Sequence, residues 1–227
     1  MSHEVNVTWF PDSPLGAWKI VEARTPENER YTGSLLVGRL GSLLLCQWST
    51  TLGSFSGVGL LHNGRMLVAR TAQGHERPGI VRYTLTSTGQ LDAVWATDQM
   101  GGLQGTGIAQ PVAPTSGTPQ TTCWDVLYYD ENGNKTRALR VCLAARGEVF
   151  DTTWHDLGRA DAGTPCFDGV GRATPTGFAA AWSRTEGHVE VVKTLLMYEP
   201  TTPGEAAGTS ATQGCDRLGE EVLRRIL

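Results

Sequence analysis

One short segment of the chain combines an acid and a base at strand spacing. In GEVFDTTWHD, Asp151, Thr153 and His155 occupy alternate positions. Side chains two residues apart on a β-strand share a face, and a carboxylate that orients a histidine can make it a general base. If this face lines a cavity, Asp151 and His155 are the best catalytic candidates in the chain. If it faces solvent, they are ordinary surface residues.

The sequence gives little evidence for a metal site or for a reactive thiol. His188 and Glu190 share a face and could begin a metal site, which would need a third ligand from elsewhere. The five cysteines are widely spaced and contain no Cys-x-x-Cys, which does not suggest a disulfide framework. Cys46 and Cys142 lie in apolar strand patterns and are expected to be reduced core residues. We predict no metal and no other cofactor.

The tryptophans are the strongest functional signal. The chain has seven, and several fall on one face of predicted strands. Such rings either fill the interior of a β-barrel or form the stacking walls of a ligand pocket, and both alternatives stay open here. The candidate ligand-binding residues are Trp48, Trp95, Trp154, Trp182 and Tyr83.

An internal repeat must position these side chains. The series AWKI, GSLLLCQWST and SFSGVG returns as CWDV, GEVFDTTWHD and CFDGVG. Trp48 and Trp154 are related by an offset of 106 residues, and Phe55 and Phe167 by an offset of 112. A constant offset that changes once indicates duplication followed by growth of a loop, and it predicts two copies of one architecture.

Turn residues and composition indicate an all-β fold. Glycine is frequent, and short runs of β-forming residues end at turn signals such as Asn63-Gly64. We predict antiparallel β-barrels built from two pseudo-repeats. The expected divisions are a first β repeat over 1–111, a Pro-rich linker over 112–120, a second repeat over 121–200, and a flexible segment with a short amphipathic helix over 201–227. The second barrel could be incomplete, with an open edge, or both copies could share one sheet system.

The order of short motifs in the first copy resembles a known barrel pattern. These are Tyr31-Thr-Gly33, Gln47-Trp48, Gly57-Val58-Gly59, a Gly79-to-Tyr83 strand, Gly89-x-Leu91, Trp95 and Gly105-Thr-Gly107. The series is similar to lipocalin-like or avidin-like barrels of poorly characterised bacterial proteins. The resemblance implies a β-barrel that binds a ligand, and it implies no catalytic residues.

Composition limits the partners. The net charge is −4 and no basic stripe exists, which excludes nucleic acid as a partner. No apolar run reaches the roughly 18 residues of a membrane span, and the N-terminus lacks a signal-peptide pattern. A cytoplasmic location is therefore expected. A homo-oligomer or a partner protein could bind through the apolar stripe of the helix expected over 216–227.

These observations predict a non-catalytic binding protein. Its ligand would be a small apolar or aromatic molecule, or an extended peptide in a groove between the repeats or on an open edge. Such a protein could serve as an accessory protein that presents a precursor in natural-product biosynthesis. The alternative is an enzyme, a cofactor-independent cyclase or isomerase that uses Asp151 and His155 inside the barrel.

Overall fold

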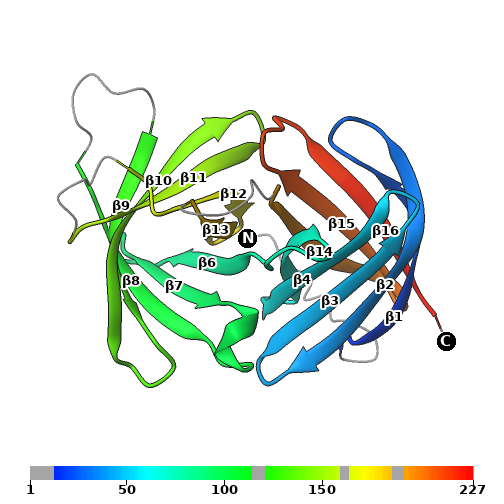
Figure 1. Cartoon of the computed structure of the whole chain (residues 1–227), viewed down its shortest axis with the longest axis horizontal. Helices are drawn as coiled ribbons and strands as arrows, with labels where there is room; N and C mark the ends of the chain where they lie inside the picture. The colour runs from blue at the N-terminus through cyan, green and yellow to red at the C-terminus, as the bar shows by residue number, and fades with distance from the viewer. Residues whose placement is uncertain (1–12, 114–120, 159–163, 186–191, 227) are drawn as a thin grey trace.

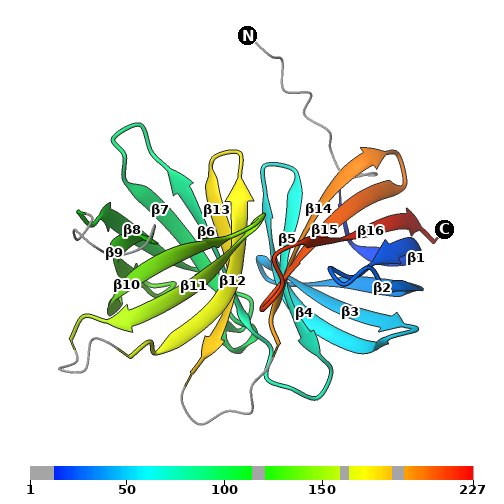
Figure 2. The same cartoon turned by 90° about the horizontal axis from the view of Figure 1, so that it is seen from above.

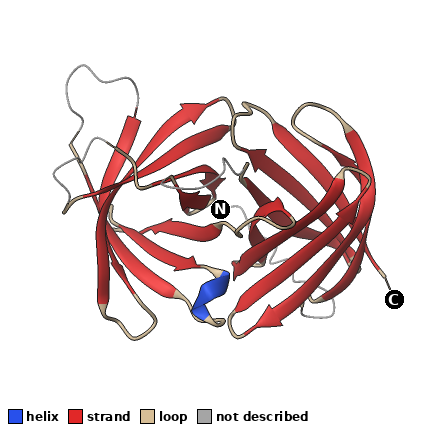
Figure 3. Ribbon diagram, viewed as in Figure 1, coloured by secondary structure: helices blue, strands red, loops and turns tan. Residues whose placement is uncertain are grey.

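The computed structural model describes residues 13–113, 121–158, 164–185 and 192–226. These residues form sixteen strands and one short 3-10 helix, η1, which is the only helical element among them (Figure 3). The elements are β1 (Gly16–Arg24), β2 (Arg30–Leu40), β3 (Leu43–Thr50), β4 (Gly53–His62), β5 (Arg65–Ala72), β6 (Gly79–Leu85), β7 (Leu91–Ala96), η1 (Asp98–Met100), β8 (Gly105–Pro111), β9 (Thr121–Tyr129), β10 (Lys135–Arg146), β11 (Val149–Asp156), β12 (Phe167–Thr174), β13 (Gly177–Arg184), β14 (Thr194–Thr202), β15 (Glu205–Thr212) and β16 (Leu218–Arg225).

The strands close into two antiparallel barrels of eight strands each, which lie next to each other (Figures 1 and 2). The terminal barrel contains β1–β5 and β14–β16, and the inserted barrel contains β6–β13. The chain therefore enters the inserted barrel after β5 and leaves it after β13. The predicted all-β barrel architecture is confirmed, and closure of both barrels rules out the open edge considered for the second one.

The sequence repeat is confirmed, but each barrel contains strands of both copies. Strands β1–β8 correspond in order to β9–β16, so each copy gives five strands to one barrel and three to the other. The registers agree with this correspondence, because Gly57 pairs with Arg70 just as Gly169 pairs with Trp182. The barrels thus do not follow the boundaries 1–111 and 121–200. The Pro-rich segment instead connects β8 and β9, two paired strands of the inserted barrel.

The C-terminal segment corrects our prediction of a flexible stretch and a helix. Residues 205–212 and 218–225 form β15 and β16, which close the terminal barrel. Burial alternates along β16, with Gly219, Glu221 and Leu223 facing inward and Val222 largely exposed. The expected apolar stripe failed because Val222 and Ile226, which belong to it, are exposed, whereas Glu221 faces the barrel interior and finds partners for its carboxylate there. An association through a C-terminal helix is therefore not available.

A disulfide corrects our expectation for the cysteines. Cys123 on β9 and Cys142 on β10 are direct cross-strand partners and are bonded to each other. The widely spaced cysteines concealed this pairing, because only the register of the hairpin brings the two positions together. Cys46 is a free, buried thiol, as predicted, and burial raises its pKa.

Three apolar clusters hold the fold together. One fills the terminal barrel and one lies within the inserted barrel. The third lies between the barrels, where outward-facing Leu67 and Leu195 pack with Ile80 and Val170 of the inserted barrel. The two barrels therefore share a buried apolar interface. In the described part of the chain, no helix has the length and apolarity that crossing a membrane requires.

Candidate ligand-binding cavity

A cavity of about 480 Å³ opens at one end of the inserted barrel. Its volume falls within the range of small-molecule sites, roughly 300–1,000 Å³. Five aromatic side chains from five different strands line it: Trp95, Tyr128, Trp154, Phe167 and Trp182. Two of the contacts between these rings are edge to face, with Phe167 and Trp182 centroids 5.0 Å apart and Trp95 and Tyr128 centroids 6.2 Å apart.

Glycines on the neighbouring strands make room for two of the indoles. Gly79 is the cross-strand partner of Trp182, and Gly105 is that of Trp95. A Cβ atom at either glycine would overlap the indole ring of its partner. The glycines of the sequence motifs at 79 and 105 thus let two flat walls lie against the sheet.

The inner end of the cavity is uncharged. The hydroxyls of Tyr83 and Tyr128 are hydrogen-bonded to each other, and Trp154 Nε1 donates to them at 3.2 and 3.1 Å. Burial raises the pKa of Tyr83 to about 12 and raises that of Tyr128 well above its ordinary value. Both phenols are therefore neutral at physiological pH.

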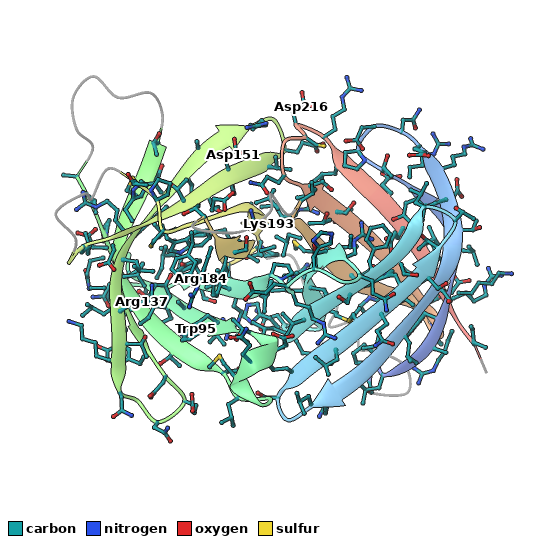
Figure 4. All side chains as sticks on the ribbon, viewed as in Figure 1. Trp95, Arg137, Asp151, Arg184, Lys193 and Asp216 are labelled. Carbon is teal, nitrogen blue, oxygen red and sulfur yellow. A yellow bond between two sulfur atoms is a disulfide. The ribbon has the colours of Figure 1, made fainter. Side chains whose placement is uncertain are left out.

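The mouth of the cavity carries charge. Arg77, Arg137 and Arg184 all line it, and Figure 4 shows the last two close to Trp95. Arg77 is paired with Asp98 at 3.2 Å. Arg137 lies over the ring of Phe167 at 5.3 Å. Among the described residues, no carboxylate forms an ion pair with Arg137 or Arg184.

A charged network lies inside the apolar core of the terminal barrel. The carboxylate of Glu221, whose side chain is 1% exposed, accepts hydrogen bonds from Tyr31, from Tyr198 at 2.5 Å and from Arg70 at 3.1 Å. Arg70 also lies over the ring of Trp48 at 5.5 Å. Burial and the Glu221 charge raise the pKa of Tyr31 and Tyr198. For Arg70, burial is the largest single influence and would lower the pKa, but Glu221, Tyr31 and Tyr198 together outweigh it and the net pKa is raised.

The repeat relates the charged network to the cavity. In both barrels a tryptophan on the third strand of a copy donates to a tyrosine, Trp48 to Tyr198 and Trp154 to Tyr83. The neighbouring positions differ. Where the terminal barrel has Arg70, Tyr31 and Glu221, the inserted barrel has Trp182, Arg137 and Gly107. At these positions the inserted barrel therefore has an indole and a glycine in place of a buried ion pair.

The structure divides the predicted binding residues into three groups. Trp95, Trp154 and Trp182 all line the cavity. Tyr83 lies beneath it and is joined to it through Trp154. Trp48 belongs to the other barrel, where it contacts the Arg70 guanidinium.

The cavity residues that sequence reasoning missed include Tyr128, Phe167, Arg137 and Arg184. Phe167 belongs to the repeated Phe-x-Gly-Val-Gly motif and could have been found there. The two arginines gave no local signal, because only the closed barrel brings β10 and β13 to one mouth.

The structure does not bring the predicted catalytic pair together. Thr152 and Trp154 of β11 are buried, so Asp151 and His155 lie on the opposite, outer face of that strand. At about 3.3 Å per residue they are about 13 Å apart along the strand. Asp151 is bound by Arg146, and His155 Nε2 lies 3.1 Å from Thr153 Oγ1. Its Nδ1 is buried without a hydrogen-bond partner among the described residues.

Evidence for a metal site is also missing from the described part of the chain. No three His, Cys, Asp or Glu side chains there form a group that could hold a metal ion. His188 and Glu190 lie outside the described residues. Comparisons of the chain with protein-family models, with curated proteins and with solved structures give no match.

Proposed function

We propose that this protein is a non-catalytic binding protein that holds a small aromatic or apolar molecule in the inserted barrel. The aromatic lining of the cavity carries this proposal. Flat indole walls and neutral, hydrogen-bonded phenols at the inner end suit a guest that stacks and excludes water. The alternative enzyme would need residues other than Asp151 and His155, since that pair lies outside the barrel.

A lipocalin-like or avidin-like assignment agrees with this function. Up-and-down barrels of eight antiparallel strands commonly hold a single small ligand at their mouth. Each barrel here has eight strands paired in that manner. We favour a small molecule over a peptide, because closure of both barrels removes the strand edges to which a peptide could add.

The biological setting of the protein stays a prediction. Service as an accessory protein in natural-product biosynthesis fits a binding protein without a catalytic set. A cytoplasmic location is the simplest expectation from the sequence, but a disulfide such as Cys123–Cys142 is more typical of an oxidising compartment. Thiol counting on protein isolated from its own cells would decide between the two.

A neutral aromatic probe tests the binding function. N-phenyl-1-naphthylamine brightens in an apolar site, and we expect saturable binding by the wild-type protein. Replacing Trp182 by leucine should weaken binding about tenfold, because one stacking wall is lost. Trp124→Leu is the matched control, since Trp124 is also a half-buried tryptophan of the inserted barrel but does not line the cavity. No saturable binding, or equal loss in both variants, would refute the proposal.

A further inference from the structure

Two arginines lie next to Phe167, an aromatic residue of the cavity mouth. Arg184 is the cross-strand partner of Phe167, and the guanidinium of Arg137 lies 5.3 Å from the centroid of the same ring. Both arginines line the cavity beside Trp182. The mouth therefore joins a hydrophobic wall to two cationic groups, which is the arrangement that recognises a molecule with an aromatic body and an anionic end.

The mouth also carries acids, and their positions matter. Asp98 and Glu76 line the same opening. Asp98 is engaged by Arg77 at 3.2 Å, and Glu76 accepts a hydrogen bond from Gln99 at 3.4 Å. Neither acid is an ion-pair partner of Arg137 or Arg184 within the described ranges. Among the residues that the structure describes, these two guanidinium groups thus face the opening without a carboxylate paired to either of them.

The terminal barrel contains a buried cation that is neutralised by a carboxylate of the same chain. There the carboxylate of Glu221 neutralises Arg70, beside the indole of Trp48. The inserted barrel has Gly107 at the position equivalent to Glu221, so the chain supplies no carboxylate at that position. The inserted barrel has its arginines at the mouth, where an incoming anion can reach them.

We propose that the cavity binds an aromatic molecule that bears one anionic oxygen group, such as a carboxylate. Its rings lie against Trp95 and Trp182, and its anion lies at the mouth between Arg137 and Arg184. This inference rests on the proposed binding function and specifies the class of ligand. Bidentate donation from a guanidinium gives the anion a fixed orientation, so the apolar end enters first.

Two probes with the same aromatic body separate charge from stacking. 1-Anilinonaphthalene-8-sulfonate is N-phenyl-1-naphthylamine with one added sulfonate, which stands in for the anionic group. We expect the wild-type protein to bind the sulfonate about tenfold more tightly than the neutral probe. Arg137→Gln or Arg184→Gln should each weaken sulfonate binding about threefold to fivefold, as for partly exposed charge pairs. Binding of the neutral probe should change less than twofold.

A neighbouring arginine provides the control. Arg140 lies on the same strand as Arg137, but it pairs with Asp125 at 2.7 Å and does not line the cavity. Arg140→Gln removes the same charge and should leave both probes unaffected. The advantage of the sulfonate in the wild type should also shrink from low salt to 0.5 M salt, because exposed charges are screened.

The outcomes distinguish this inference from the proposed function. Equal affinity for both probes, with no effect of Arg137→Gln and Arg184→Gln, would overturn the anionic ligand and leave the binding function standing. Failure of both probes to bind would overturn both. A loss that is the same in Arg140→Gln as in Arg137→Gln would show a general effect of net charge and would also overturn the inference.

Discussion

Removing the Glu221 carboxylate should be the most damaging single polar change in the terminal barrel. Glu221→Gln keeps the shape of the side chain but leaves the Arg70 guanidinium, with a side chain 11% exposed, without a counter-charge. At 3.1 Å and an effective dielectric constant of about 20, the lost attraction is about 5 kcal/mol. Breaking a buried pair from one side costs about 3–5 kcal/mol. We expect that loss in the free energy of unfolding.

The assay is urea unfolding followed by circular dichroism, with thermal unfolding beside it. A loss of this size should lower the melting temperature by roughly 10–15 °C for a chain of this length. The double variant Arg70→Met/Glu221→Gln should recover most of the stability, since neither charge remains buried and the amide oxygen at position 221 can still accept from Tyr31 and Tyr198. The single variant Arg70→Met completes the set. The double-mutant cycle then gives a coupling free energy of about 2 kcal/mol or more between the two positions.

An exposed pair that also involves β16 is the matched control. Arg224 and Glu205 join β16 to β15 at 3.0 Å, with side chains 64% and 36% exposed. Glu205→Gln should cost far less stability than Glu221→Gln, because solvent screens this pair. If Glu221→Gln cost no more than Glu205→Gln, or if the cycle showed no coupling, the reasoning from burial would be refuted.

Two further predictions follow from the buried tyrosines and the exchanged strands. Burial raises the pKa of four tyrosines above about 10, the value in the unfolded chain. The stability that each contributes is therefore complete below pH 10 and is lost as the pH rises through the folded pKa. For Tyr83, whose folded pKa is about 12, the stability lost is about 3 kcal/mol. Absorbance at 295 nm should show these tyrosines un-ionised in the folded protein at pH 10.5, and ordinary ionisation there would contradict the burial. The four are Tyr31, Tyr83, Tyr128 and Tyr198. A protease site inserted within 114–120 should give a cut chain that still elutes as one particle, because each barrel needs strands from both fragments; halves that separate without denaturant would refute the exchange.

Local patterns were sufficient for the strands and for part of the site. Alternation along 42–50 and 148–156 places Trp48 and Trp154 on matching faces of their strands, and the structure shows that both faces point into the barrels. Three of the predicted binding residues line the cavity, because a large aromatic side chain on a strand of a small barrel is buried mainly by pointing into the barrel. The same alternation placed Asp151 and His155 together on the other face, and only the structure shows that this face is the outer one.

Long-range partners were beyond reach from the sequence. Glu221 resembles a surface residue until Tyr31 and Arg70, more than 150 residues away in the chain, are brought to it. The same holds for the Cys123–Cys142 bond, which depends on hairpin register. The Glu221 contacts form only after the barrel has closed, and the disulfide only after the hairpin has paired, so no short window of neighbouring residues contains the information.

The exchange of strands explains why one repeat unit could give two different interiors. Each interior is assembled from both copies, so its character depends on combinations such as Arg70 from one copy with Glu221 from the other. The opposite combination, Gly107 with Trp182, leaves space and no ion pair. A buried pair of charges holds its position only when both members are present. In the inserted barrel both charges of the pair are absent, and aromatic side chains surround a cavity instead. This barrel lacks an internal carboxylate, and its mouth carries the arginines that could bind the anionic group of a ligand.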